Sequence, residues 1–107
     1  MCDLAAVERD VDGCLIRPDD WSPTIAASLA REEHILLEAA HWEIVRLLQR
    51  YYAEHEISPA MRALVSLVRR ELGSDKGNSL YLLKLFPGSP ARIASKIAGL
   101  PKPEHCL

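Results

Sequence analysis

The sequence contains no apolar run long enough to cross a bilayer, and its first residues carry no signal-peptide pattern. Its three cysteines are an odd number without a CxxC spacing, and its four histidines lack the HxxH and HExxH spacings of metal ligands. These absences argue against a membrane protein, a disulfide framework and a zinc site. We expect a cytoplasmic protein that makes no membrane contact and needs neither a metal nor an organic cofactor.

The chain of 107 residues has room for one domain, 1–107, and is too short for two. Its apolar content of 49% and charged content of 26% are ordinary for a globular protein. The net charge of -2 conceals an asymmetry, because residues 1–40 carry nine acids and three bases whereas residues 73–107 carry five bases and two acids. A mildly basic tail favours an anionic partner only weakly, and an ordinary solvated surface explains it equally well.

Capping residues and apolar spacing predict most of the helices. Ser22-Pro23 is a typical helix start, with serine as the N-cap and proline in the first turn. A second helix is expected over roughly 38–54, where the start offers no short polar cap. Ser58-Pro59 is interpreted as the cap of a third helix, whose one-sided apolar stripe Gly73 ends.

Two shorter helices and a hairpin complete the predicted fold. Residues 80–86 are apolar on nearly every side, which indicates a short buried helix, and Ser89-Pro90 begins a last helix that Gly99 closes. Asp12-Gly13 lies between short apolar runs and predicts a turn. The expected fold is mainly α: a compact bundle of about five helices with a small N-terminal β-hairpin and a mobile C-terminal arm, 99–107.

The arm carries a penultimate cysteine, Cys106, where a chain normally frays. Pro101 and Pro103 favour an extended polyproline conformation, at about 3.1 Å per residue, so that the span from Gly99 to Cys106 reaches roughly 20 Å. Such an arm can deliver a thiol into the active site of another protein. The alternative, a frayed tail with an incidental cysteine, is equally compatible with the residues alone.

Several motifs together resemble the TusE/DsrC family. They are Asp12-Gly13, Trp21, His41-Trp42-Glu43, Ser58-Pro59-Ala60, Lys76-Gly77-Asn78-Ser79, Leu85-Phe86-Pro87 and the C-terminal Lys96-Ile97-Ala98-Gly99-Leu100-Pro101-Lys102-Pro103 with Cys106. The resemblance covers essentially the whole chain, and its C-terminal stretch is the most specific part. It implies a helical fold and a sulfurtransferase that carries sulfur as a persulfide on the penultimate cysteine.

The resemblance also suggests partners. TusE-type members take sulfur from a TusBCD complex and pass it to the MnmA thiolase, which makes 2-thiouridine in tRNA, so that tRNA is contacted only indirectly. DsrC-type members serve sulfite reductase or sulfur oxidation and need a second arm cysteine, at a position that Ser95 occupies here. The missing thiol favours the TusE-like role and leaves a DsrC-like partner or regulator as the alternative.

Some positions depart from the family pattern. Leu80 and Ser66 stand where basic residues are usual, which weakens a direct contact with tRNA and leaves open a different acceptor. Cys14 replaces an aromatic and is expected to be a small packing residue rather than a second reactive thiol. Cys2 is interpreted as incidental. Cys106 is therefore the only predicted catalytic residue.

Three basic residues near the arm are predicted to bind the partner: Arg92, Lys96 and Lys102. They either steer the arm towards an acidic rim or form a solvated face that complements the end of a helix dipole. The last helix and the arm both contribute to this set.

A helix-turn-helix regulator is the alternative from another class. The second and third helices are joined by a short turn, and Arg62, Arg69 and Arg70 lie on the third. The apolar start Pro59-Ala60-Met61 and the negative net charge oppose DNA binding, because a recognition helix presents polar groups in its first turns. Retention on nonspecific DNA at low salt would distinguish a regulator from a sulfur carrier.

Overall fold

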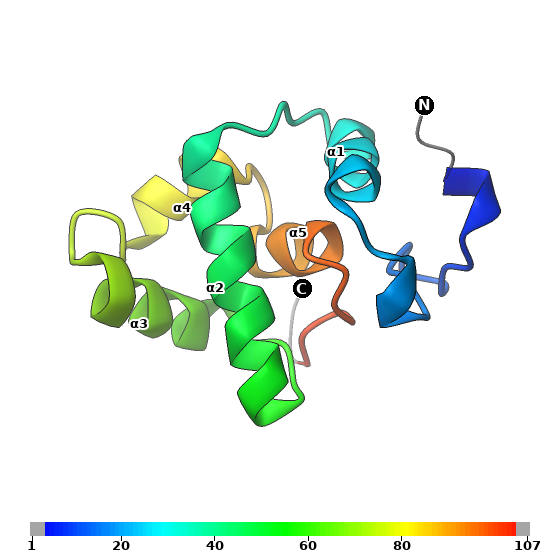
Figure 1. Cartoon of the computed structure of the whole chain (residues 1–107). Helices are drawn as coiled ribbons and strands as arrows, with labels where there is room; N and C mark the ends of the chain where they lie inside the picture. The colour runs from blue at the N-terminus through cyan, green and yellow to red at the C-terminus, as the bar shows by residue number, and fades with distance from the viewer. Residues whose placement is uncertain (1–3, 105–107) are drawn as a thin grey trace.

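The computed structural model describes residues 4–104, in which four α-helices surround a fifth (Figure 1). The surrounding helices are α1 (Pro23–Glu32), α2 (Ala39–His55), α3 (Met61–Leu72) and α4 (Ser79–Leu85), and the central helix is α5 (Pro90–Ile97). Short 3-10 turns, η1 (Leu4–Ala6) and η2 (Pro18–Asp20), precede them. The prediction of a mainly helical fold with about five helices is confirmed. Among the described residues, no helix is long and apolar enough to span a membrane.

The central helix α5 organises the core. It packs against each of the other four helices, and seven of its eight residues are buried, Arg92 being the exception. Fully buried side chains from all four neighbours close around it, among them Leu29, Ile44, Leu48, Leu64, Val68 and Leu82. Because α5 is buried on all but its Arg92 side, the chain that leaves its C-terminal end starts from the interior of the molecule.

The helix starts explain why these segments fold as they do. The Ser22 hydroxyl accepts a hydrogen bond from the Ile25 amide, which confirms the predicted cap of α1. The Asn78 side chain caps α4 in the same way through the Tyr81 amide. The start of α2 was predicted to lack a cap. It has one that a residue inside the helix supplies: His41 Nδ1 accepts a hydrogen bond from the Glu38 amide at 3.0 Å. His41 Nε2 also lies 2.9 Å from the Leu85 carbonyl oxygen, and the ring packs edge-on against Phe86.

The predicted N-terminal β-hairpin is wrong. Residues 4–104 contain no β-strand, and the expected ladder is reduced to one antiparallel bridge between Arg9 and Leu15. The Asp10 carboxylate accepts hydrogen bonds from the amides of Asp12 and Cys14, both at 2.9 Å. A side chain that binds nearby amides competes with a strand ladder, so the segment forms a compact turn instead.

Two predictions about α3 and α4 are also corrected. Ser58 does not cap α3, whose N-cap residue is Ala60. The helix α4 was expected to be buried on all sides, but Leu80 is 74% exposed and Leu83 is 40% exposed. An almost entirely apolar helix of seven residues therefore buries one face, centred on Leu82, and leaves another in water.

Candidate functional site

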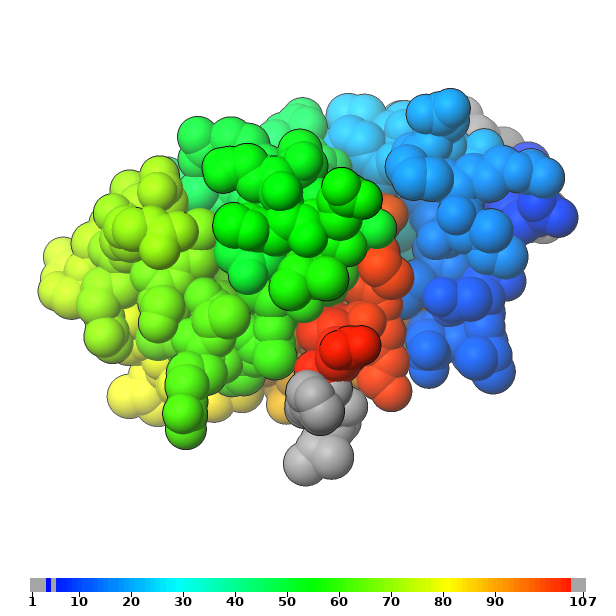
Figure 2. All heavy atoms as spheres, turned by 90° about the horizontal axis from the view of Figure 1, so that it is seen from below, coloured from blue at the N-terminus to red at the C-terminus, as the bar shows by residue number. Residues whose placement is uncertain are grey.

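The predicted catalytic residue, Cys106, lies outside the described residues, which end at Glu104. The structure therefore bears on the arm through its root, the segment from Ile97 to Glu104. Ala98, Gly99, Leu100 and Pro103 are buried in this root. Figure 2 shows its outer part as an orange-red ridge between the green α2–α3 region and the blue N-terminal segment.

Side chains from two distant elements bind the carbonyls that end α5. Trp21 Nε1 donates to the Ile97 carbonyl oxygen at 2.8 Å, and Gln49 Nε2 donates to that of Ala98 at 3.1 Å. The last carbonyls of a helix have no partner within the helix, so they accept bonds from elsewhere. Trp21 and Gln49 therefore fix the position at which the arm leaves α5.

Gly99 is required where the chain turns out of α5. Its φ is +82°, in the left-handed region that favours glycine, and a Cβ there would lie 2.6 Å from Trp21 Cδ1. The Leu100 amide then donates to the Ser95 carbonyl at 2.9 Å. The sequence correctly assigned to Gly99 the end of the helix, and the contact with Trp21 adds a second reason for it.

Ser58 fixes the arm further along. Its hydroxyl donates to the Pro101 carbonyl oxygen at 2.6 Å, from the loop between α2 and α3. This bond replaces the predicted helix cap. In this conformation Gly99, Leu100 and Pro103 are buried against the body, so a free span starts after Pro103 and is shorter than the roughly 20 Å counted from Gly99. The mobility of the arm stays a prediction.

The predicted partner-binding bases have carboxylate neighbours within the chain. Lys96 is buried, with its Nζ atom 2.7 Å from Glu33 Oε2 and 3.1 Å from Glu32 Oε1. Arg92 lies 3.9 Å from Glu33, and Lys102 lies 3.9 Å from Asp12. Lys96 thus joins α5 to the end of α1, whereas the side chains of Arg92 and Lys102 are about one third exposed. The prediction that these bases bind a partner stays untested.

Cys14 is a packing residue, as expected. Its side chain is buried, and its pKa is raised to about 11, mainly by this burial and less by Asp10 and Asp12, against the opposing charges of Lys96 and Arg92. The thiolate is the reactive form, so this thiol is inert near neutral pH.

Ser95 is also fully buried, and its hydroxyl oxygen has no hydrogen-bond partner among the described residues. Cys2 lies outside the described residues.

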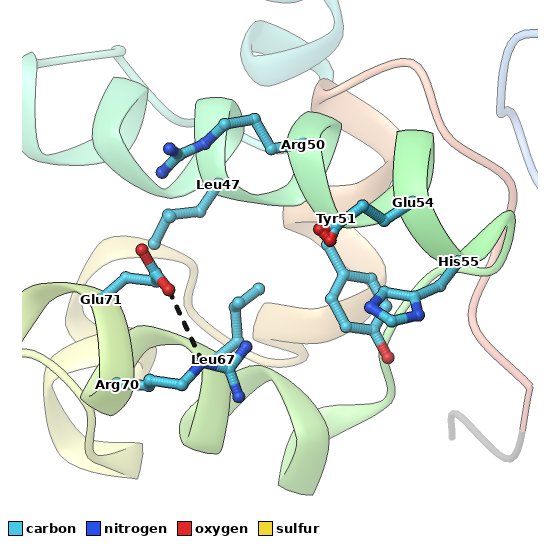
Figure 3. A pocket seen from close by; sticks show the side chains of 8 residues that line it. All are labelled: Leu47, Arg50, Tyr51, Glu54, His55, Leu67, Arg70 and Glu71. Atoms are coloured by element: carbon cyan, nitrogen blue, oxygen red, sulfur yellow. Dashed lines mark ion pairs between the residues drawn. The ribbon is translucent and has the colours of Figure 1, made fainter.

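A hollow between α2 and α3 holds charges of both signs (Figure 3). Tyr51 and His55 pack ring against ring there, and Arg70 pairs with Glu71 at 3.5 Å. Arg69 Nε donates to the Gly77 carbonyl at 3.2 Å, so two of the three arginines expected on a recognition helix are engaged inside the chain. No cysteine, serine or threonine lines the hollow. The described residues also contain no cluster of three histidine, cysteine or acidic side chains that could hold a metal.

Sequence reasoning missed the residues that hold the arm. Trp21 was named only as part of the family motif, Ser58 was expected to be a helix cap, and Gln49 was not singled out. Their bonds reach the carbonyls of residues 97, 98 and 101, which lie 76, 49 and 43 positions away. No local spacing carries such a signal. The arm motif itself, however, correctly marked this end of the chain.

The sequence of the chain matches one protein family and several curated proteins over nearly its whole length. A family described as DsrC-like proteins matches residues 2–107. The sulfurtransferase TusE of Photorhabdus laumondii is 46% identical over 94% of this chain and 91% of its own length. The TusE homologue of Haemophilus influenzae is 48% identical over 94% of this chain and 93% of its own length.

Solved structures of DsrC proteins share the fold of this chain. The NMR structure of DsrC from Allochromatium vinosum is 42% identical, with a TM-score of 0.85 over 94% of this chain and 90% of its own. The crystal structure of the oxidised γ-subunit of dissimilatory sulfite reductase, DsrC, from Archaeoglobus fulgidus is 37% identical, with a TM-score of 0.80 over 94% and 92%. The chain therefore belongs to the DsrC-like family and is a sulfurtransferase of the sulfur-relay type.

Proposed function

We propose that the chain carries sulfur as a persulfide on Cys106 and delivers it for the 2-thiolation of the wobble uridine of tRNA. In this role a TusBCD-like complex is the donor and an MnmA-like thiolase is the acceptor. The observation that carries the proposal is that Cys14 is buried with a raised pKa. The resemblance to the family adds that Ser95 stands where DsrC-type members have their second cysteine. Cys106 is then the thiol suited to exchange.

The proposed reaction is two thiol exchanges without net oxidation. The Cys106 thiolate attacks the outer sulfur of a donor cysteine persulfide; its S–S bond breaks, and the donor cysteine leaves as a thiolate. The outer sulfur is now bonded to Cys106. An acceptor thiolate attacks that sulfur in turn and releases the Cys106 thiolate. Each step forms one S–S bond and breaks one, so no external oxidant, reductant or cofactor is consumed.

A role beside sulfite reductase is the second candidate, because DsrC proteins are among the structural neighbours. The family's DsrC-type chemistry uses two arm thiols, and Ser95 cannot supply the second one. Oxidation of the chain should accordingly give no disulfide within the arm. A disulfide joining Cys106 to another cysteine of the same chain would favour the DsrC-like role instead.

The test is the intact mass of the chain after incubation with a cysteine desulfurase, cysteine and a TusBCD-type donor complex. The unmodified chain and Cys2→Ser should each gain the mass of one sulfur atom, mapped to Cys106. Cys106→Ser should gain none, and 2-thiouridine formation by an MnmA-type thiolase should then fall to background. Sulfur mapped to Cys14 would show that the arm mechanism is wrong.

A further inference from the structure

The anchored root limits where Cys106 can react. The root stays on the body through the Ser58–Pro101 bond and the buried Pro103. Cys106 follows Glu104 by two residues, and an extended chain spans at most about 3.6 Å per residue, so the two Cα atoms lie within about 7 Å of each other. A protein that exchanges sulfur with Cys106 while the root stays anchored must therefore touch the surface around Glu104.

That surface has an apolar groove on each side of the root. The groove on one side lies between the root and the α2–α3 connection and has a volume of about 400 Å³; Ile57, Ala60 and Ala63 contribute its apolar wall. The groove on the other side lies against the N-terminal turn and has a volume of about 350 Å³; Leu15 and Ile16 contribute to it. Pro101 lines both. We call these two grooves and the ridge between them the exit face.

Exposed isoleucines make the exit face unusual for a surface in water. Ile57 is 57% exposed and Ile16 is 55% exposed, one on each side of the root. Large apolar side chains that gather in a rimmed patch indicate contact with another protein. Lys102, Glu104 and Glu56 supply charged groups at the edge of the Ile57 groove. An apolar centre with a polar edge is the usual build of a protein interface.

We propose that the exit face is the docking surface for the protein that exchanges persulfide sulfur with Cys106, and that this partner covers Ile57 and Ile16 with an apolar segment of its own. The inference rests on the proposed function and adds the place where the partner binds. The argument for this occupant is the short chain beyond Glu104, which brings the reacting partner to this face. The exposed leucines of α4 and Leu36 line neither groove.

The experiment compares Ile57→Asp and Ile16→Asp with Leu80→Asp, which places the same charge on an exposed apolar position of α4. The rate of sulfur transfer to Cys106 from the persulfide-loaded donor complex is measured against chain concentration, in a Cys2→Ser background. Each isoleucine variant should lose roughly tenfold or more in kcat/KM, mainly through KM, because an unpaired charge opposes an apolar contact. Leu80→Asp should stay within about twofold of the unmodified chain.

Two readouts separate docking from damage to the fold or to the thiol. The helical circular dichroism signal and the alkylation rate of Cys106 by iodoacetamide should be the same in all variants. Transfer rates equal to the unmodified chain in both isoleucine variants would overturn the docking proposal while the proposed function stands. A chain that gains no sulfur even when unmodified would overturn both. A dimer of the chain that Ile57→Asp dissociates would assign the face to a second copy and also overturn the proposal.

Discussion

Cys14 and Cys106 carry the same thiol group, and Cys14 is the one whose surroundings lie among the described residues. Cys14 lies in the N-terminal turn with its sulfur buried, beside Asp10 and Asp12. Desolvation and two carboxylates disfavour its thiolate, so it packs and does not react. The raised pKa of Cys14 also makes its effect on stability measurable as a function of pH.

The stability of the fold should depend on pH through Cys14. Its pKa rises from 9.0 to about 11 in the folded state, so between these values the folded chain holds a proton that the unfolded chain has lost. The free energy of unfolding falls as pH rises wherever the folded state binds more protons. The contribution, on the order of 2 kcal/mol, is complete below the lower value and lost as pH rises through the upper one.

The measurement is urea unfolding of the unmodified chain and of Cys14→Ala across that pH interval. The unmodified chain should lose stability relative to Cys14→Ala as the solution becomes more alkaline. A constant difference between the two proteins at all pH values would show that the Cys14 thiol titrates normally in the fold.

At the scale of elements, α5 carries both the core and the base of the arm. Its one buried cation, Lys96, is held by Glu32 and Glu33 at the end of α1, and Arg9 pairs with Glu32 from the N-terminal turn. Lysine is almost never fully buried unless it is paired. The ammonium therefore links three segments of the chain. The prediction that Lys96 binds a partner stays untested.

Lys96→Met should lower the free energy of unfolding by about 2 kcal/mol. This loss is smaller than that expected when a fully buried ion pair is broken, because the side chains of Glu32 and Glu33 are partly exposed. The apolar replacement fits the buried stem but leaves Glu33 without its nearest cation. Lys84→Met, at an exposed position of α4, is the matched control and should change stability by less than about 0.5 kcal/mol. Urea unfolding near neutral pH measures both, and equal effects would show that the buried pair contributes little.

At the scale of the whole molecule, the root of the arm ties together segments that are far apart in sequence. Trp21 precedes α1, Gln49 lies in α2, and Ser58 follows α2, yet all three bond to the last residue of α5 or to the chain just beyond it. The position from which the arm departs is consequently a property of the assembled fold.

Ser58→Ala should loosen the arm without unfolding the protein. Losing the bond to Pro101 should cost about 1 kcal/mol and widen the distance distribution between nitroxide labels placed by Glu104→Cys and Thr24→Cys, in a chain with Cys2 and Cys106 replaced by serine. Ser66→Ala, on the exposed face of α3, is the control and should leave the distribution unchanged. Equal distributions in the two variants would show that Trp21, Gln49 and the buried Pro103 hold the root without Ser58.

The sequence by itself determined the helical class, the starts at Ser22 and Pro90, the end of α3 at Gly73, and the arm with its penultimate thiol. These features depend on hydrogen bonds or backbone preferences within about four residues, which local spacing records. The tertiary structure alone decided that the hairpin becomes a turn, that Leu80 faces water and that the root of the arm is anchored. Ser58 reaches Pro101 across 43 positions and Lys96 reaches Glu33 across 63. Such contacts exist only once the helices have packed, so no local pattern can carry them.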